Sequence, residues 1–255
     1  MRIAIVAPPW LPVPPPAYGG TENTLDTLAR GLKRAGHDVL LCTTGDSTCP
    51  VERTWVFEKS IGVGSGTSVD EIRHVTHAYG QLDDVDVVHD HTLVGPLYSA
   101  SFPRLPVVTT NHGPFNADLI GLYRAVADRV PVIAISRHQA STAQDVAVAA
   151  VIHHGIDVDD YPAGPGGGGY ALFLGRMHPG KAPHVAARIA REAGFPLRIA
   201  AKIAFGASDV CSGSPTRASN VSKRRCSSRL KRPVRSARSP AALKPSATAA
   251  PCATE

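Results

Sequence analysis

The sequence lacks the segments that membrane, secreted and zinc-binding proteins need. No apolar run approaches the ~18 residues of a membrane-spanning helix, and only a short apolar run separates Arg2 from Pro8, too little for a secretory signal. The 5 cysteines are odd in number and form no C-x-x-C pair, which argues against a disulfide framework and a zinc site. We therefore expect a cytoplasmic protein with reduced thiols and no transmembrane segment; peripheral contact with a membrane stays open.

Charge is scarce in most of the chain and is concentrated near its end. Of the 255 residues, 43% are hydrophobic and 19% are charged, a composition that supports a packed core. Residues 1–203 hold 17 Lys and Arg against 19 Asp and Glu, whereas residues 204–255 hold 10 against 2. The formal net charge of +6 therefore belongs to the tail, and we expect no specific nucleic-acid partner for the body of the chain.

Short apolar runs alternate with segments of helical periodicity along residues 1–160. Strand-like runs occur at 2–7, 38–43, 85–89, 106–110, 131–135 and 149–152. Helical patterns occupy 21–35, 68–79 and 116–129, the second one opened by a capping box from Ser68 to Glu71, and Ser136 is expected to cap a further short helix. Strands that alternate with helices predict an α/β fold with a doubly wound parallel sheet.

The composition changes near residue 160. Residues 161–169 are rich in glycine and read as a linker, and residues 170–202 restart the pattern with a strand at 170–174, a loop, a helix at 181–193 and a strand at 197–201. We interpret 170–202 as the beginning of a second, partial domain. Residues 203–255 have no hydrophobic periodicity, and we expect this basic tail to be disordered.

The first candidate binding element is the glycine pair Gly19-Gly20, which follows a proline-rich loop and opens a predicted helix. Exposed backbone N–H groups and the helix dipole favour an anion at such a place, and the absence of Cβ atoms lets a phosphate or a sugar come close. The alternative is an ordinary glycine turn. A nicotinamide-dependent dehydrogenase is disfavoured, because no G-x-G-x-x-G follows the first strand.

Polar residues follow two of the predicted strands at their carboxyl ends, the edge at which open α/β sheets bind ligands. His89 and His91 end one strand, and Asn111 and His112 end another. His89 and His91 could bind a metal ion, but no third ligand stands at a suitable spacing, so we expect cleft lining or structural roles and no metal. His112 can donate a hydrogen bond to a hydroxyl group or polarise a reacting group. We interpret His74 and His77, three apart on a helix, as surface residues.

Arg176 and Lys181 form the second candidate phosphate site, in the loop that joins the strand at 170–174 to the helix after it. A guanidinium can bind two phosphate oxygens, and an ammonium adds a point charge beside the helix dipole. The alternative is a pair of solvated surface charges. Their position in a strand-to-helix loop favours a diphosphate clamp.

Taken together, the motifs resemble the GT-B glycosyltransferases, specifically the retaining family 4 type that uses nucleotide-diphosphate sugars. The resemblance covers about residues 1–202 and depends on the order of its segments. These are RIAIVAPPW…YGGTE (2–22), GHDVLLCTT (36–44), DVVHDHTLVGP (86–96), PVVTTNHGPF (106–115), VIAISRHQ (132–139), VIHHGID (151–157) and FLGRMHPGK (173–181).

The resemblance implies two Rossmann-like domains, with the acceptor held by the N-terminal domain (1–160) and the nucleotide-sugar by the C-terminal one. It implies that Gly19 and Gly20 approach the donor phosphates, that His112 contacts the transferred sugar, and that Arg176 and Lys181 neutralise the diphosphate leaving group without a metal or other cofactor. His89, His91, Asn111 and Ser136 are then candidates for the lining of the cleft. The retaining mechanism would need no protein nucleophile. The partners implied are a nucleotide-sugar donor and a sugar or glycolipid acceptor.

The resemblance stops after Lys202, and His154 stands where the family pattern has an Asn. We therefore expect an incomplete donor domain, and we hypothesise that residues 203–255 come from a frameshift, which the other reading frames of the gene would test. The expected function is a glycosyltransferase whose transfer is impaired by truncation. Two alternatives remain, namely a non-catalytic acceptor-binding module and weak non-specific nucleic-acid binding through the basic tail.

Overall fold

The structure is a computed structural model that describes residues 1–63, 66–161 and 163–202. The chain divides into two compact units, Met1–Pro165 and Gly166–Glu255. The boundary between them falls inside the segment 161–169 that the sequence marks as a linker. The tail at 203–255 lies outside the described residues, so its predicted character stays a prediction.

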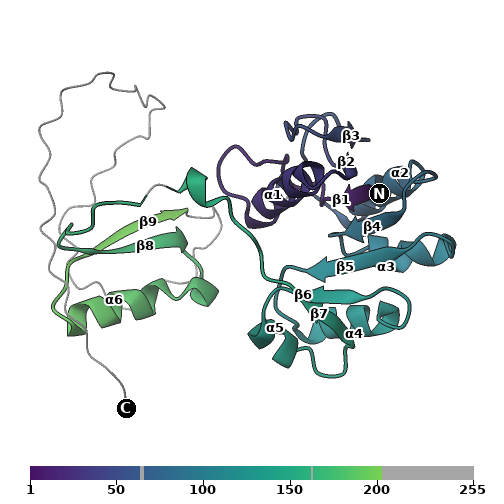
Figure 1. The fold of residues 1–255 in the computed structure, drawn as a ribbon. Coiled ribbons are helices and arrows are strands. Elements are labelled where there is room, and N and C mark those ends of the chain that lie inside the picture. Colours follow the sequence, from purple (N-terminus) through teal and green to yellow (C-terminus); the bar gives the residue numbers. More distant parts are fainter. Residues whose placement is uncertain (64–65, 162, 203–255) are drawn as a thin grey trace, which may run out of the picture. The chain divides into compact units, whose positions relative to one another are not determined.

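The first unit is built on a seven-stranded sheet in the order β3-β2-β1-β4-β5-β6-β7 (Figure 1). Its strands are β1 (Arg2–Val6), β2 (Asp38–Cys42), β3 (Glu52–Thr54), β4 (Val87–Asp90), β5 (Val107–Asn111), β6 (Val132–Ala134) and β7 (Val148–Val151). Every neighbouring pair is parallel. Because all strands run the same way, their carboxyl ends lie at one edge of the sheet. The predicted α/β fold with a parallel sheet is confirmed.

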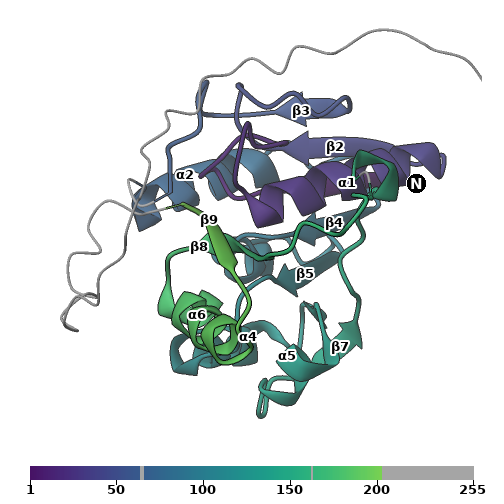
Figure 2. The same ribbon diagram turned by 90° about the vertical axis from the view of Figure 1, so that its left-hand side faces the viewer.

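Helices cover the two faces of this sheet unequally. They are α1 (Gly20–Arg34), α2 (Ser68–Tyr79), α3 (Gly95–Tyr98), α4 (Ala117–Val126) and α5 (Arg137–Ser141), with 3₁₀ turns η1 (Ser99–Ser101) and η2 (Val158–Asp160). On one face α2 and α4 pack against β1, β2, β4, β5 and β6 around the buried rings of Tyr79 and Tyr123. On the other face α1 buries Leu25 and Ala29 against β1 and β2 (Figures 1 and 2).

The ends of the helices follow local chemistry. Gly36, just after α1, has φ of 86°, a left-handed conformation that favours glycine. The capping box of α2 is formed by Thr67 and Asp70, not by Ser68 and Glu71 as predicted. The Asp70 carboxylate already accepts from the Thr67 backbone N–H at 2.9 Å, and Glu71 turns its side chain to the loop at 93–94 instead.

The sequence analysis also missed one strand of the first unit and placed one histidine wrongly. The edge strand β3 was not predicted, because its three residues ERT carry no apolar run; its pairing with β2 creates it. His74 is not a surface residue, since only 1% of it is exposed. Its Nε2 lies 2.8 Å from the carbonyl oxygen of Ala7, a tertiary contact that helical spacing does not reveal.

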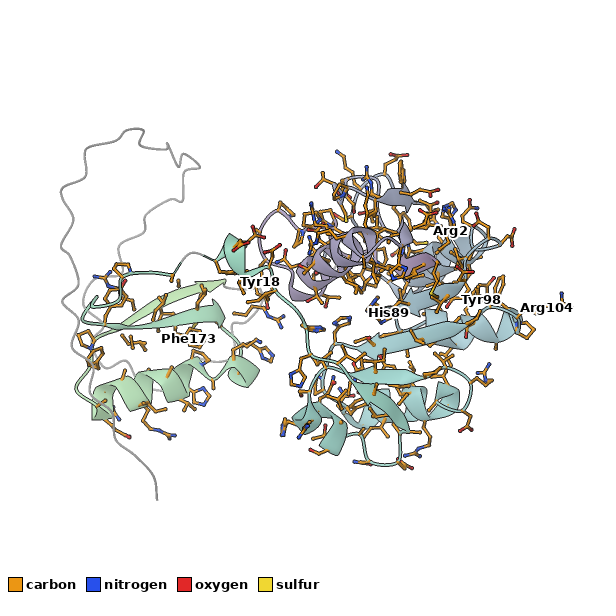
Figure 3. All side chains as sticks on the ribbon, viewed as in Figure 1. Arg2, Tyr18, His89, Tyr98, Arg104 and Phe173 are labelled. Carbon is orange, nitrogen blue, oxygen red and sulfur yellow. The ribbon has the colours of Figure 1, made fainter. Side chains whose placement is uncertain are left out.

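The second unit, as far as it is described, holds a parallel pair of strands, β8 (Ala171–Arg176) and β9 (Leu197–Lys202), joined through η3 (Pro179–Lys181) and α6 (Pro183–Glu192). Side chains along β8 alternate between half-buried and exposed, with Phe173 half-buried (labelled in Figure 3). Leu172 and Leu174 stay 57% and 79% exposed, so one face of this two-stranded sheet has little cover among the described residues.

None of the helices within 1–63, 66–161 and 163–202 is long and apolar enough to cross a membrane.

Candidate functional site

Three imidazoles from distant parts of the chain meet at the carboxyl edge of the sheet. His91 follows β4 and His112 follows β5, and because these strands are neighbours, His91 Nδ1 lies 2.8 Å from His112 Nε2. His154 follows β7, and its Nε2 lies 3.2 Å from His112 Nδ1. The rings of His112 and His154 stack, with centroids 5.0 Å apart and planes inclined by 22°.

His89 extends this cluster along β4 (labelled in Figure 3). Its ring centroid lies 4.0 Å from that of His91, and its Nε2 lies 2.8 Å from Thr110 Oγ1 on β5. His89 and His91 project from the same face of β4 because they are two residues apart. The sequence places both histidines and His112 at the carboxyl edge of the sheet, and the structure brings their rings together there; their roles stay predictions.

The cluster lies along a cavity of about 350 Å³. One wall is α1, the floor is formed by β4, β5 and β6, and the segment after β7 forms the rest. The lining residues are Thr24, Thr27, Leu28, Gly31, Leu32, Arg34, His89, His91, Thr110, His112, Ile133, Ile152, His153, His154 and Gly155. No carboxylate is among them, and the described lining offers hydroxyl and imidazole hydrogen-bonding groups and the guanidinium of Arg34 beside apolar surface.

Burial keeps these imidazoles uncharged at neutral pH. It lowers the pKa of His89 and of His112 to about 4 and that of His91 well below its ordinary value. The mutual repulsion of neighbouring histidines acts in the same direction on His91 and His112. The pKa of His154, which is largely exposed, is lowered as well, mainly because neighbouring atoms partly desolvate its ring. The cluster therefore offers neutral donors and acceptors and no positive charge.

A buried acidic network holds the loop that carries His91. Asp90, on the opposite face of β4, accepts from Tyr79 Oη at 2.9 Å and from the Thr92 backbone N–H and hydroxyl at 2.8 and 2.7 Å. Glu71 Oε1 accepts from the Leu93 N–H at 2.7 Å. Burial raises the pKa of Asp90 to about 6, although these hydrogen bonds act against the shift. The network fixes residues 90–93 on both sides of His91.

Asn111 and Ser136, expected as cleft lining, do not line this cavity. Asn111 is buried, and its Oδ1 accepts from the Gly113 N–H at 2.9 Å. Ser136 caps α5 as predicted, accepting from the Gln139 N–H at 3.0 Å. Gln139, which the sequence did not single out, donates to the Asn111 carbonyl at 2.9 Å and joins the ends of β5 and β6. These residues shape the loop beneath His112.

Gly19 and Gly20 lie at the start of α1, as predicted. A Cβ on Gly19 would stand 2.8 Å from Pro15, so only glycine fits there, whereas a Cβ on Gly20 would meet nothing within 4 Å. The helix start has no side-chain cap. Glu22, in the first turn, is 6% exposed, and burial raises its pKa. The backbone of Gly20 is thus accessible, but a buried acid lies close behind it.

Arg176 and Lys181 belong to the second unit, and their setting differs from the predicted loop. Arg176 is the last residue of β8, paired with Lys202 of β9. Lys181 ends the turn η3, and α6 begins at Pro183, where the missing N–H of proline is tolerated. Both residues are exposed. Their diphosphate-binding role stays a prediction.

Within 1–63, 66–161 and 163–202, no group of three or more His, Cys, Asp and Glu side chains is arranged to hold a metal ion. The histidine nitrogens instead face one another in pairs. Sequence reasoning missed His154 as a member of the cluster, because it lies 42 residues from its partner His112. The one signal was that it replaces an Asn in the pattern VIHHGID.

Two comparisons with known proteins indicate a glycosyltransferase. The family model "Glycosyltransferase Family 4" matches residues 18–160, the part of the chain that holds the histidine cluster and its cavity. AviGT4, a glycosyltransferase involved in avilamycin A biosynthesis, is a solved structure with 25% sequence identity and a TM-score of 0.55. The match covers 79% of this chain and 57% of AviGT4; no curated protein matches. Since the family model spans more than half of the sequence, the chain belongs to glycosyltransferase family 4.

Proposed function

We propose that the protein belongs to an enzyme system that transfers a sugar from a nucleoside-diphosphate sugar to a sugar or glycolipid acceptor. The observation that carries this proposal is the cavity with its histidine cluster, which lies within the segment that matches the family model. In this proposal the first unit holds the acceptor. His112 donates a hydrogen bond to the transferred sugar, and Gly19 and Gly20 accommodate the donor phosphates.

Sugar transfer from a nucleoside-diphosphate sugar depends more on stabilising the leaving group than on a protein nucleophile. When a nucleoside diphosphate departs, negative charge builds on its oxygens, and fixed cations stabilise that charge. We assign this role to Arg176 and Lys181, so that no metal or other cofactor takes part. A retaining reaction on one face of the sugar needs no protein nucleophile.

Two further parts of the proposal concern activity and location. The chain spans 57% of the length of AviGT4, and the described part of the second unit supplies one strand–helix–strand element for the donor. Arg176 and Lys181 are both exposed to solvent, and exposed charges contribute little to an ion pair. We therefore expect weak donor binding and impaired transfer. Cys42 and Cys49 are free and buried, which supports a reducing compartment such as the cytoplasm. No specific nucleic-acid partner is expected.

Calorimetric titration of the full chain with UDP-glucose and with GDP-mannose tests the proposal. We expect at least one of them to bind with a Kd on the order of 1 mM, and the double variant Arg176→Ala/Lys181→Ala to weaken that binding severalfold. Arg188→Ala/Arg191→Ala, on exposed positions of α6, is the matched control and should leave it unchanged.

Equal binding by both double variants would reject the diphosphate role of Arg176 and Lys181. Submicromolar binding would show that the donor site is not impaired. Retained acceptor affinity with no donor binding at all would favour the alternative, an acceptor-binding module without transfer.

A further inference from the structure

Both ring nitrogens of His112 are engaged by other histidines. Nε2 faces His91 Nδ1 at 2.8 Å and Nδ1 faces His154 Nε2 at 3.2 Å. The three rings therefore form a chain of two hydrogen bonds that starts beneath the cavity and ends in the exposed segment after β7. His91 is 7% exposed, whereas His154 is exposed to solvent.

Such a chain has only two arrangements of its protons. A neutral imidazole carries one N–H and one unprotonated nitrogen, so His112 donates to one neighbour and accepts from the other. Either His91 donates to His112 and His112 donates to His154, or both bonds run the opposite way. The low pKa values of His91 and His112 are consistent with neutral rings at pH 7.

The buried end of the chain decides between these arrangements. His91 Nε2 is fully buried and has no hydrogen-bond partner among the described residues. If the bonds ran from His154 towards His91, this nitrogen would carry a buried N–H without an acceptor, an arrangement that is rare and costly in proteins. In the opposite direction Nε2 holds only a lone pair. The other end is solvent-exposed, so water can satisfy His154 in either case.

We propose that His91 is a positioning residue that holds His112 in the Nδ1–H tautomer and directs this donor to the place where His154 Nε2 lies. His91 donates through Nδ1 to His112 Nε2. The single ring N–H of neutral His112 is therefore on Nδ1. His91 is in turn fixed by the hydrogen bonds of Asp90 and Glu71 to the residues around it.

This arrangement gives His154 a defined part. It accepts the Nδ1–H of His112 over 3.2 Å, and it lies in a segment with large exposed apolar residues, among them Ile152 and Ile156. A ligand hydroxyl group that entered the cavity would displace His154, and its oxygen would accept the hydrogen bond from His112 Nδ1–H in place of His154 Nε2. This last step rests on the proposed function, whereas the tautomer of His112 does not.

Long-range ¹H–¹⁵N NMR spectra of the histidine rings in the full ¹⁵N-labelled chain at pH 7 test the proposal. The ring signals of His112 are identified by their loss in His112→Gln. We expect Nδ1 of His112 to carry the proton in the unaltered protein, although free imidazole side chains favour the proton on Nε2. A His112 ring protonated on Nε2 would overturn the proposal by itself.

Variants of His91 and His154, the two neighbours of His112, distinguish a specific effect of His91 on the His112 tautomer from a general disturbance of the structure. His91→Ala removes the donor, and we expect the dominant tautomer of His112 to reverse to Nε2–H. His91→Asn offers an amide N–H near the position of the lost Nδ1 and should restore Nδ1–H. His154→Ala removes only the acceptor, so Nδ1–H should persist.

Persistence of Nδ1–H in His91→Ala, or its loss in His154→Ala, would show that His91 does not set the tautomer. If His91→Ala does not fold, the proposal is still tested by the spectra of the unaltered protein, His91→Asn and His154→Ala. None of these spectra involves a nucleotide-sugar. A failure here therefore leaves the proposed transferase function intact, and an absence of donor binding leaves the tautomer assignment intact.

Discussion

Tyr79 Oη donates a hydrogen bond of 2.9 Å to Asp90 Oδ2 in the core behind the histidine cluster. Tyr79 is 1% exposed and Asp90 is fully buried. The ring of Tyr79 also meets Tyr98 edge-on, with centroids 5.6 Å apart. Since Asp90 precedes His91 in the chain, this contact links the packing of α2 against the sheet to the position of the cluster on the other face.

Tyr79→Phe should destabilise the protein by about 1–3 kcal/mol, because it leaves a buried carboxyl oxygen with one donor fewer. The ring and its packing are kept, so the loss reports the hydroxyl group alone. Urea-induced unfolding followed by circular dichroism measures the difference. Tyr98→Phe is the matched control: its hydroxyl makes no such contact with Asp90, and its stability should change by less than about 0.5 kcal/mol. Equal effects of both variants would refute the prediction.

Gly95 lies against the same carboxylate. A Cβ built on it would overlap the Asp90 side chain, so Gly95→Ala should force Asp90 away from Tyr79 and cost about 2 kcal/mol or more. Gly121 offers a matched control within α4, because a Cβ there meets nothing within 4 Å. Gly121→Ala should stabilise the protein by about 0.5–1 kcal/mol, as alanine is the better helix residue. Thermal unfolding of the two variants should move in opposite directions, and a shift of both in one direction would contradict the argument.

The parallel sheet could be predicted from the sequence because each buried strand is a short apolar run between turn residues. The expected strand 38–43 and the observed β2 (Asp38–Cys42) differ by one residue. The polar strand β3 could not be predicted from the sequence, because only its pairing with β2 defines it. His91 and His112 were predicted to lie at one edge, since parallel order brings successive strand ends together. Their hydrogen bonds to one another and to His154 depend on side-chain directions, which strand patterns do not contain.

Acid should destabilise the protein through His74. Its Nε2 lies 2.8 Å from the Ala7 carbonyl, and burial lowers its pKa from the ordinary 6.5 to about 4. The unfolded chain then binds a proton more readily than the folded one, so the stability from neutral His74 is present above pH 6.5 and is lost as the pH falls towards 4. Between pH 7 and pH 5 we expect this residue to contribute about 2 kcal/mol of loss.

The variant His74→Gln isolates the contribution of His74 to this loss of stability. Glutamine keeps a donor for the Ala7 carbonyl but cannot be protonated. The free energy of unfolding in urea, measured at pH 7 and pH 5, should fall by about 2 kcal/mol less in the variant than in the unaltered protein. His89 and His112, whose pKa values are also lowered, keep part of the acid sensitivity in both. An identical pH dependence of the two proteins would rule out His74 as a source.

Ser136→Ala distinguishes a helix cap from a residue of the binding site. The Ser136 hydroxyl accepts from the Gln139 N–H at 3.0 Å, so its loss should cost about 1 kcal/mol of stability. Because Ser136 does not line the cavity, any nucleotide-sugar affinity measured by calorimetry should stay unchanged. Ser141→Ala, at the end of the same helix, removes a hydroxyl that donates to the exposed His138 carbonyl and should alter stability by less than about 0.5 kcal/mol. Lost ligand affinity at full stability in Ser136→Ala would instead place this hydroxyl group in contact with the ligand, because a cap acts on the helix and not on the substrate.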